Sequence, residues 1–190
     1  MKLGKRFEEY LGEFVYGAID GTVTTFAVVA GAAGAGLSSV VIVILGFANL
    51  IADGFSMGAS AYLSAKSKRD LKIRQHTEEG IERDPHDHTH GETPLKDGLT
   101  TFISFVIVGF VPFMLYVGDS LLGLDTDGGT LFMWSGILTG LTFAGIGLLK
   151  AHVTKTKPVR AAGETLALGA IAAALAYLLG SVLAKALNLE

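Results

Sequence analysis

The fold is decided by residues 14–63, which read FVYGAIDGTVTTFAVVAGAAGAGLSSVVIVILGFANLIADGFSMGASAYL. This stretch contains no Lys or Arg, and its only acidic residues are Asp20 and Asp53. A helix of this composition has no polar face for water, so it must be surrounded by lipid or by other apolar groups. Residues 98–149 also lack Lys and Arg, and residues 161–184 carry Glu164 as their single charge. The sequence therefore predicts an integral membrane protein and excludes disorder and an ordinary soluble enzyme.

The composition of the whole chain agrees with this assignment. Of its 190 residues, 17% are charged, compared with about 25% in a typical soluble domain. There is no Cys, which excludes disulfide bonds, thiolate metal sites and a Cys nucleophile. The segments between the apolar stretches are too short for a second sizeable domain.

The apolar stretches divide into spans at turn signals rich in Gly, Ser and Asp. A helix needs about 20 residues to cross the hydrocarbon core. We therefore expect an all-α fold of five transmembrane helices, near residues 14–34, 39–64, 98–117, 130–150 and 161–184. Pro112 is expected to kink the third of them. Three regions follow: residues 1–64 hold the N-terminal tail and the two helices of a cation path, residues 65–97 form a cytoplasmic helical and irregular loop, and residues 98–190 hold the other three helices.

The basic residues set the orientation of these spans. All but one of the 15 Lys and Arg residues lie in the tail, the 65–97 loop or the turn at 150–160. A five-span arrangement puts these three segments on one side of the membrane, and Lys185 is the exception. By the positive-inside rule, the N-terminus is predicted to be cytoplasmic and the C-terminus to lie outside.

Polar residues recur on one face of each of the first two spans. Asp20 and Thr24 are four residues apart, as are Asn49, Asp53 and Met57, so each set shares a helix face. Ionisable groups at membrane depth usually mark a pathway, and no Lys or Arg lies at this depth to neutralise the acids. We therefore predict that these five residues line a cation path. The alternatives are that Asp53 bonds a neighbouring helix, that Asn49 only joins helices, and that Met57 only fills the core.

The donor set on this path favours a divalent transition metal. Carboxylates and the Asn49 amide supply oxygen ligands, whereas the Met57 thioether is a soft ligand that suits Fe²⁺ and later ions. A carboxylate in a site of low dielectric can also exchange a proton for the metal. We expect the metal binding residues to be Asp20, Asn49, Asp53 and Met57, with the ion as substrate and no permanently bound cofactor.

The cytoplasmic loop holds a second group of metal-binding side chains. The carboxylates of Glu78, Glu79 and Glu82 are followed by the alternating imidazoles of His86, His88 and His90. These side chains suit Fe²⁺, Mn²⁺ or Zn²⁺, so the loop is a candidate metal-collecting patch. The alternative is a solvated linker, because the spacing matches no zinc-finger pattern.

Two longer motifs resemble a known family. The first-span sequence YGAIDGTVTTFA at 16–27, the second-span sequence ANLIADGFSMG at 48–58 and YLSAKS at 62–67 resemble the vacuolar iron transporter family. Residues 164–166, ETL, are similar to part of its last helix. The chain looks like a bacterial or archaeal member with a shortened cytoplasmic loop. It departs from plant members at Asn49, where they commonly carry Glu, and at Lys68, where a Glu often follows Lys-Ser.

The resemblance implies a five-helix homodimer whose cation path runs between the first and second helices at the two-fold interface. It implies export of Fe²⁺, often with Mn²⁺ or other divalent ions, from the cytosol in exchange for protons. Asp20 matches the aspartate of the family's first helix, and Met57 matches the methionine of its second helix.

The function expected from the sequence is secondary transport of Fe(II) or a similar divalent ion, by proton antiport, in a prokaryotic plasma membrane. The expected partners are the metal ion, protons, the lipid bilayer and a second copy of the chain, with no nucleic acid. One alternative is a membrane-bound metal sensor or scaffold that binds ions through the loop; another is the same fold with Mn, Co, Zn or haem as cargo. An intramembrane hydrolase is not expected, because the spans contain no His to act as a base.

Overall fold

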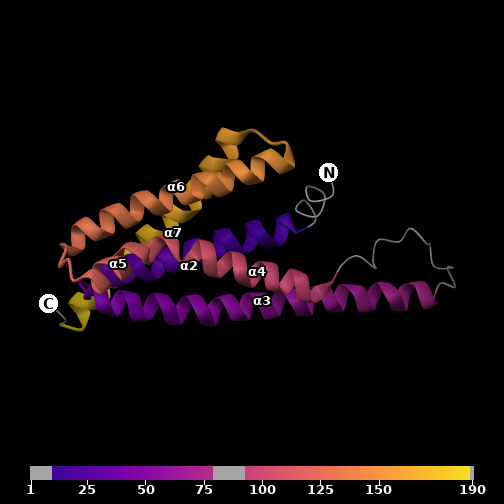
Figure 1. Cartoon of the computed structure of the whole chain (residues 1–190), viewed down its shortest axis with the longest axis horizontal. Helices are drawn as coiled ribbons and strands as arrows, with labels where there is room; N and C mark the ends of the chain where they lie inside the picture. The colour runs from indigo at the N-terminus through magenta and orange to yellow at the C-terminus, as the bar shows by residue number, and fades with distance from the viewer. Residues whose placement is uncertain (1–9, 79–92, 189–190) are drawn as a thin grey trace.

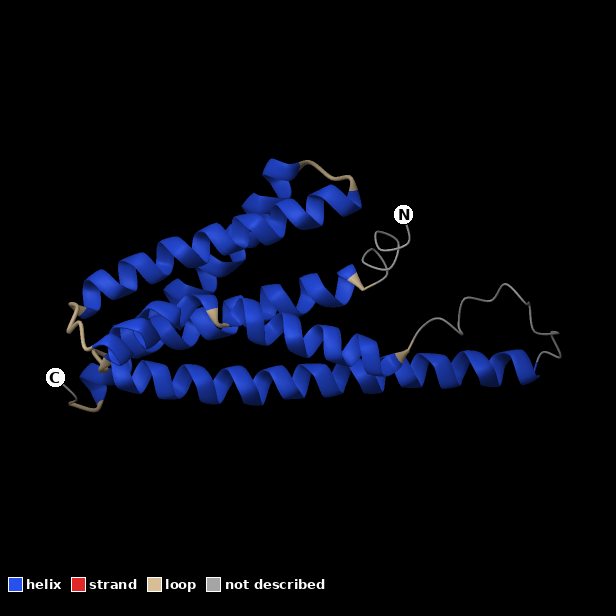
Figure 2. Ribbon diagram, in the orientation of Figure 1, coloured by secondary structure: helices blue, strands red, loops and turns tan. Residues whose placement is uncertain are grey.

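The computed structural model describes residues 10–78 and 93–188, and within these ranges all regular structure is helical (Figures 1 and 2). The elements are α2 (Leu11–Gly34), α3 (Ser39–Glu78), α4 (Pro94–Gly109), the 3-10 turn η2 (Val111–Phe113), α5 (Met114–Leu122), α6 (Gly128–Thr154) and α7 (Pro158–Ala186). Five helical segments are long and apolar enough to cross a membrane, with α4, η2 and α5 together forming the third. The prediction of an all-α membrane protein with five spans is confirmed.

The third span is interrupted where Pro112 was expected to kink it. The α-helix ends at Gly109, and a 3-10 turn containing Pro112 separates it from α5. Proline has no N–H to donate, so the regular hydrogen-bond ladder cannot continue through it. The hydroxyl of Ser135 in α6 donates to the Pro112 carbonyl. The interruption is thus held by a neighbouring helix.

The second span continues into the segment predicted as the cytoplasmic loop. Helix α3 is unbroken for 40 residues, up to Glu78. Its last 13 residues, 66–78, are exposed wherever their side chains are described, and all of them except Leu71 and Ile73 are polar, so this part stands outside the apolar region. At about 1.5 Å per residue, it extends roughly 20 Å beyond the span.

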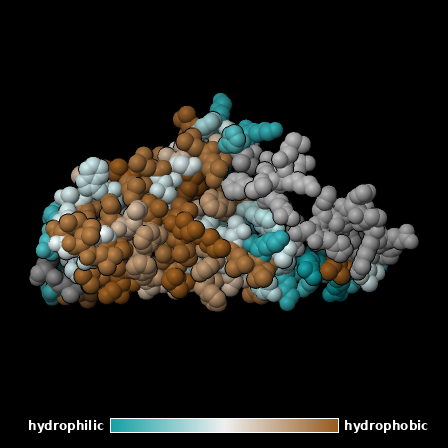
Figure 3. All heavy atoms as spheres, viewed as in Figure 1, coloured by the Kyte–Doolittle hydropathy of each residue, from teal (hydrophilic) through white to brown (hydrophobic). Residues whose placement is uncertain are grey.

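The basic segments gather at one end of the molecule. The start of α2, the end of α3, the start of α4 and the α6–α7 turn lie at this end, opposite the α2–α3 and α5–α6 turns (Figure 1). Every Lys and Arg of the described ranges except Lys185 lies at the basic end. Figure 3 shows a hydrophobic middle flanked by hydrophilic ends. The charges are therefore separated as the five-span arrangement requires.

Glycines allow close contact between α4 and the first two spans. A Cβ on Gly21 would lie 2.5 Å from the Phe105 carbonyl oxygen, and one on Gly58 would lie 2.9 Å from the Gly98 carbonyl oxygen. Gly17 and Gly54 also face α4. Helix α2 packs most extensively on α4 and α7, and α3 packs mainly on α4. The glycine pairs of the first two motifs thus fix the two spans against a common partner.

Thr165 joins the last two spans and gives a first testable prediction. Its buried hydroxyl donates to the Phe143 carbonyl of α6 at 2.9 Å, within reach of the Ala162 carbonyl of its own helix. We expect Thr165→Val to lower the free energy of unfolding by on the order of 1 kcal/mol, as for other interhelical hydrogen bonds in membranes. Thermal unfolding in detergent measures this. Thr142→Val is the matched control, because that hydroxyl bonds its own helix at Leu138; equal losses in both variants would contradict the prediction.

Candidate functional site

Two carboxylates from different helices lie near one another within the apolar region. Asp20 is in the middle of α2, Asp53 is on α3, and both side chains are half-buried. They are close enough that the charge of Asp53 repels that of Asp20. Within residues 10–78 and 93–188, neither carboxylate accepts a hydrogen bond or forms an ion pair. The structure thus brings together two acids whose charge the described chain does not compensate.

The packing of α4 explains why these two acids lie to one side of the bundle. Gly21 and Gly54 turn toward α4, and each directly follows one of the acids in sequence. Successive residues point about 100° apart around a helix, so Asp20 and Asp53 flank the α4 contact and do not enter it. Their half-buried state follows from this position.

The other three predicted path residues lie on the same two helices. The Thr24 hydroxyl donates to the Asp20 carbonyl at 2.8 Å. The Asn49 Nδ2 is buried and has no hydrogen-bond partner in the described residues. Met57 is half-buried and packs against the hydrophobic core. Asn49, Asp53 and Met57 are one turn apart along α3, about 6 Å for each step.

Two other acids near membrane depth have structural roles. Asp119 is buried, and its Oδ1 accepts a hydrogen bond from the Thr126 backbone N–H at 3.1 Å. Asp127 caps α6 by accepting from the Thr130 N–H at 3.0 Å. Both acids hold the α5–α6 turn. Asp119 and Asp127 therefore both accept hydrogen bonds, whereas Asp20 and Asp53 accept none from the described residues.

A polar cleft of about 520 Å³ lies at the basic end between α2, α3 and α4. Tyr16 lines it and lies one turn before Asp20 on the same face of α2, so the cleft ends about one helical turn from Asp20. Glu13 and Asp97 also line it, and neither was predicted as a site residue. One signal for them was present in the sequence: Glu13 directly precedes the span predicted to begin near residue 14, and Asp97 directly precedes the span predicted to begin near residue 98. Only the convergence of three helices shows that the two acids share a cleft.

The predicted cytoplasmic patch is described only at Glu78. This residue ends α3, is exposed, and accepts a hydrogen bond from Arg74 Nε at 2.7 Å. Glu79, Glu82, His86, His88 and His90 lie outside the described residues. Among the residues that are described, no three His, Cys, Asp or Glu side chains are grouped to hold a metal ion.

Comparison with known proteins identifies the family of this chain. The family model described as "VIT family" matches residues 11–89 and 71–181. The chain is 27% identical to the vacuolar iron transporter of Plasmodium falciparum, over 93% of this chain and 83% of that protein. It is also 27% identical to vacuolar iron transporter 1 of Arabidopsis thaliana, over 92% and 86% respectively, and 26% identical to the vacuolar iron transporter of Toxoplasma gondii, over 92% and 74%. The chain belongs to the VIT family.

Proposed function

We propose that this protein is a secondary transporter that carries Fe(II) or a similar divalent transition metal out of the cytoplasm in exchange for protons. The observation that carries the proposal is the pair of uncompensated carboxylates, Asp20 and Asp53, within the apolar region. Burying such charges is unfavourable unless they meet an opposite charge. Membership of the VIT family supports metal-ion transport, and the names of the relatives point to transporters, not enzymes.

The residues on the path account for the choice of ion. A divalent cation neutralises the two carboxylates, and two protons neutralise them when the ion has left, so the exchange conserves charge. The Met57 thioether adds a soft donor that favours Fe²⁺ over Mg²⁺ or Ca²⁺. Thr24 and Asn49 supply neutral oxygens on the same helices. With two acids, the site binds the ion weakly enough for it to be released again.

The polar cleft is the proposed entrance to this path. It lies at the basic end, which the positive-inside rule places in the cytoplasm. Two acids, Glu13 and Asp97, line it together with two lysines, Lys68 and Lys72. Tyr16, which also lines it, lies one turn before Asp20 on α2. Metal ions would thus enter from the cytoplasm.

A second copy of the chain is proposed to close the path. Asp20 and Asp53 are half-buried in one chain, so part of each side chain remains uncovered. A two-fold dimer is the commonest symmetric assembly, and transport sites often lie where two repeated units meet.

The proposed location differs from that in the relatives' names. The relatives are named as vacuolar; for this compact chain we propose the plasma membrane of a prokaryote.

The test is a metal panel in proteoliposomes made with the full chain. Uptake of Fe²⁺, Mn²⁺, Co²⁺ and Zn²⁺ is measured with and without an imposed pH gradient. We expect Fe²⁺ uptake that rises when protons can leave the lumen. Metal binding with no uptake would support the sensor or scaffold instead. Deleting residues 78–90 should only weaken transport, whereas it would abolish the function of a sensor built on the loop.

Met57→Leu tests the thioether directly. The two side chains have similar volumes, so the fold should be little affected. We expect Fe²⁺ uptake to fall about tenfold, which corresponds to about 1.4 kcal/mol, and Mn²⁺ uptake to fall less, because Mn²⁺ prefers oxygen ligands. Met133→Leu is the control, since Met133 is exposed on α6. An equal fall for both metals would show that Met57 acts only by packing.

A further inference from the structure

A second polar cavity lies at the α6–α7 turn, away from the proposed path. Its volume is about 620 Å³. One acid, Glu164, lines it together with four cationic side chains, those of Lys150, Lys155, Lys157 and Arg160. Just below it the two helices touch, since a Cβ on Gly147 would lie 2.6 Å from the Ala162 Cα. The cavity thus sits in the fork above the closest approach of α6 and α7.

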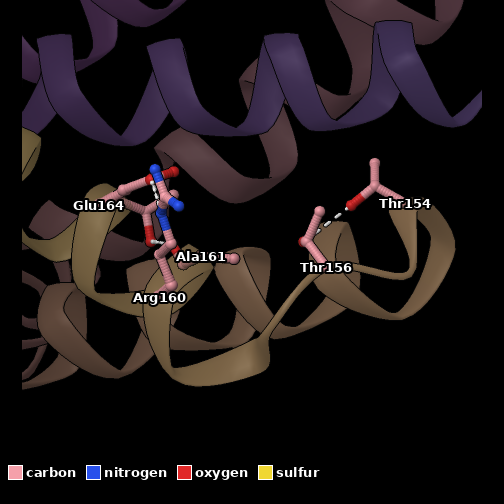
Figure 4. A network of polar contacts seen from close by, with 6 residues as sticks. Thr154, Thr156, Arg160, Ala161 and Glu164 are labelled. Carbon is pink, nitrogen blue, oxygen red and sulfur yellow. Dashed lines mark hydrogen bonds and ion pairs between the residues drawn. The ribbon is translucent and has the colours of Figure 1, made fainter.

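Hydrogen bonds within the turn hold the walls of the cavity in place. The Thr156 N–H donates to the Ala151 carbonyl at 3.2 Å, and the hydroxyls of Thr154 and Thr156 are 3.0 Å apart (Figure 4). Arg160 donates from Nε to Glu164 at 3.0 Å. This bond orients the guanidinium group and does not use its Nη groups, so they can bind an anion.

The backbone of Lys155 adopts a conformation that is unusual for lysine. Its φ is +53°, in the left-handed region, and it ends α6 at a position where Gly or Asn is usual. A lysine is disfavoured there by its Cβ. The side chain that occupies this unfavourable position lines the cavity.

The level of the cavity in the membrane indicates which kind of anion it binds. The part of α6 without Lys or Arg ends at Leu149 and that of α7 begins at Ala161, so the basic residues lie at the level of the lipid headgroups. Figure 3 shows hydrophilic atoms at this turn directly beside the hydrophobic surface. Basic pockets between membrane helices on the cytoplasmic side bind anionic headgroups. We propose that this cavity binds the phosphate of an anionic phospholipid from the bilayer.

The experiment measures lipid binding to the full-length protein in neutral detergent. Short-chain phosphatidylglycerol, phosphatidylcholine and inorganic phosphate are titrated separately. The double variant Lys155→Gly/Lys157→Gln removes two charges and keeps a residue that accepts the left-handed backbone. We expect it to bind phosphatidylglycerol about 25-fold more weakly, at about fivefold per lysine. Lys96→Gln, at the same end of the molecule but outside the cavity, should leave binding unchanged.

Three results would overturn the proposal. They are equal binding of phosphatidylcholine by the unaltered protein, an equal loss in Lys96→Gln, and inorganic phosphate binding as tightly as the lipid. Lys155→Gly alone separates structure from binding. It should raise the melting temperature and still weaken phosphatidylglycerol binding, whereas unchanged binding would mean that Lys155 serves only the turn. Lys150→Gln, which leaves the turn unaltered, should also weaken binding.

Discussion

Asp20→Asn is expected to abolish metal uptake, lowering the initial rate in proteoliposomes by about 100-fold or more. In the proposed path this carboxylate meets the cation in an apolar region, and Asn removes its charge with almost no change in shape. Losing one partner of a buried charge pair typically costs about 3–5 kcal/mol, and each 1.36 kcal/mol is a factor of ten in rate. Uptake of radioactive or fluorescently detected Fe²⁺ measures the effect.

Asp127→Asn is the matched control for this experiment. Asp127 caps α6, and Asn is an equally good N-cap residue, so uptake and folding should both be preserved. The double variant Asp20→Asn/Asp53→Asn adds a further test. If the two acids hold one ion together, the second change should have little additional effect on the residual rate. Uptake at the unaltered rate in Asp20→Asn would contradict the proposed path.

Gly180→Ala is expected to cause the largest loss of stability of any single methyl addition in α7. A Cβ at this position would lie 2.0 Å from the Gly31 carbonyl oxygen of α2. The Cβ is fixed rigidly to the α7 backbone and the oxygen belongs to the α2 backbone, so the clash can be relieved only by moving the helices apart. Overpacking typically costs about 1–3 kcal/mol, and we expect the upper part of that range or more. Thermal unfolding in detergent measures the loss.

Gly163→Ala is the control on the same helix. A Cβ on Gly163 meets no atom within 4 Å, and Ala favours a helix interior by about 1 kcal/mol over Gly. This variant should therefore be as stable as the original protein or more so. A comparable loss in both variants would show that α7 is sensitive to any substitution, and that the crossing with Gly31 is not the cause.

The spans and the polar residues on them could be predicted because each depends on local sequence. Lipid requires long apolar helices, so composition alone defines five spans, and spacing by four places Asp53 and Met57 on one face. The 3-10 turn at Pro112 follows from the missing N–H.

The contacts between distant segments could not be read from the sequence. Nothing in the sequence around Gly31 or Gly180 indicates that the two residues contact each other, because their contact depends on how α2 and α7 cross. The same holds for the cleft shared by Glu13 and Asp97, which needs three helices to converge. The left-handed backbone of Lys155 was also not expected, since Lys is not a residue that signals this conformation.

The break in the third span lies closer to the α5–α6 turn than to the start of α4. A helix that lacks a backbone hydrogen bond at proline bends more easily there than elsewhere. On one side of the break, α4 is fixed by its contacts with Gly21 and Gly58; on the other, α5 is only nine residues long. We therefore expect any bending at this break to move α5 relative to α4, in the part of the bundle opposite the basic end.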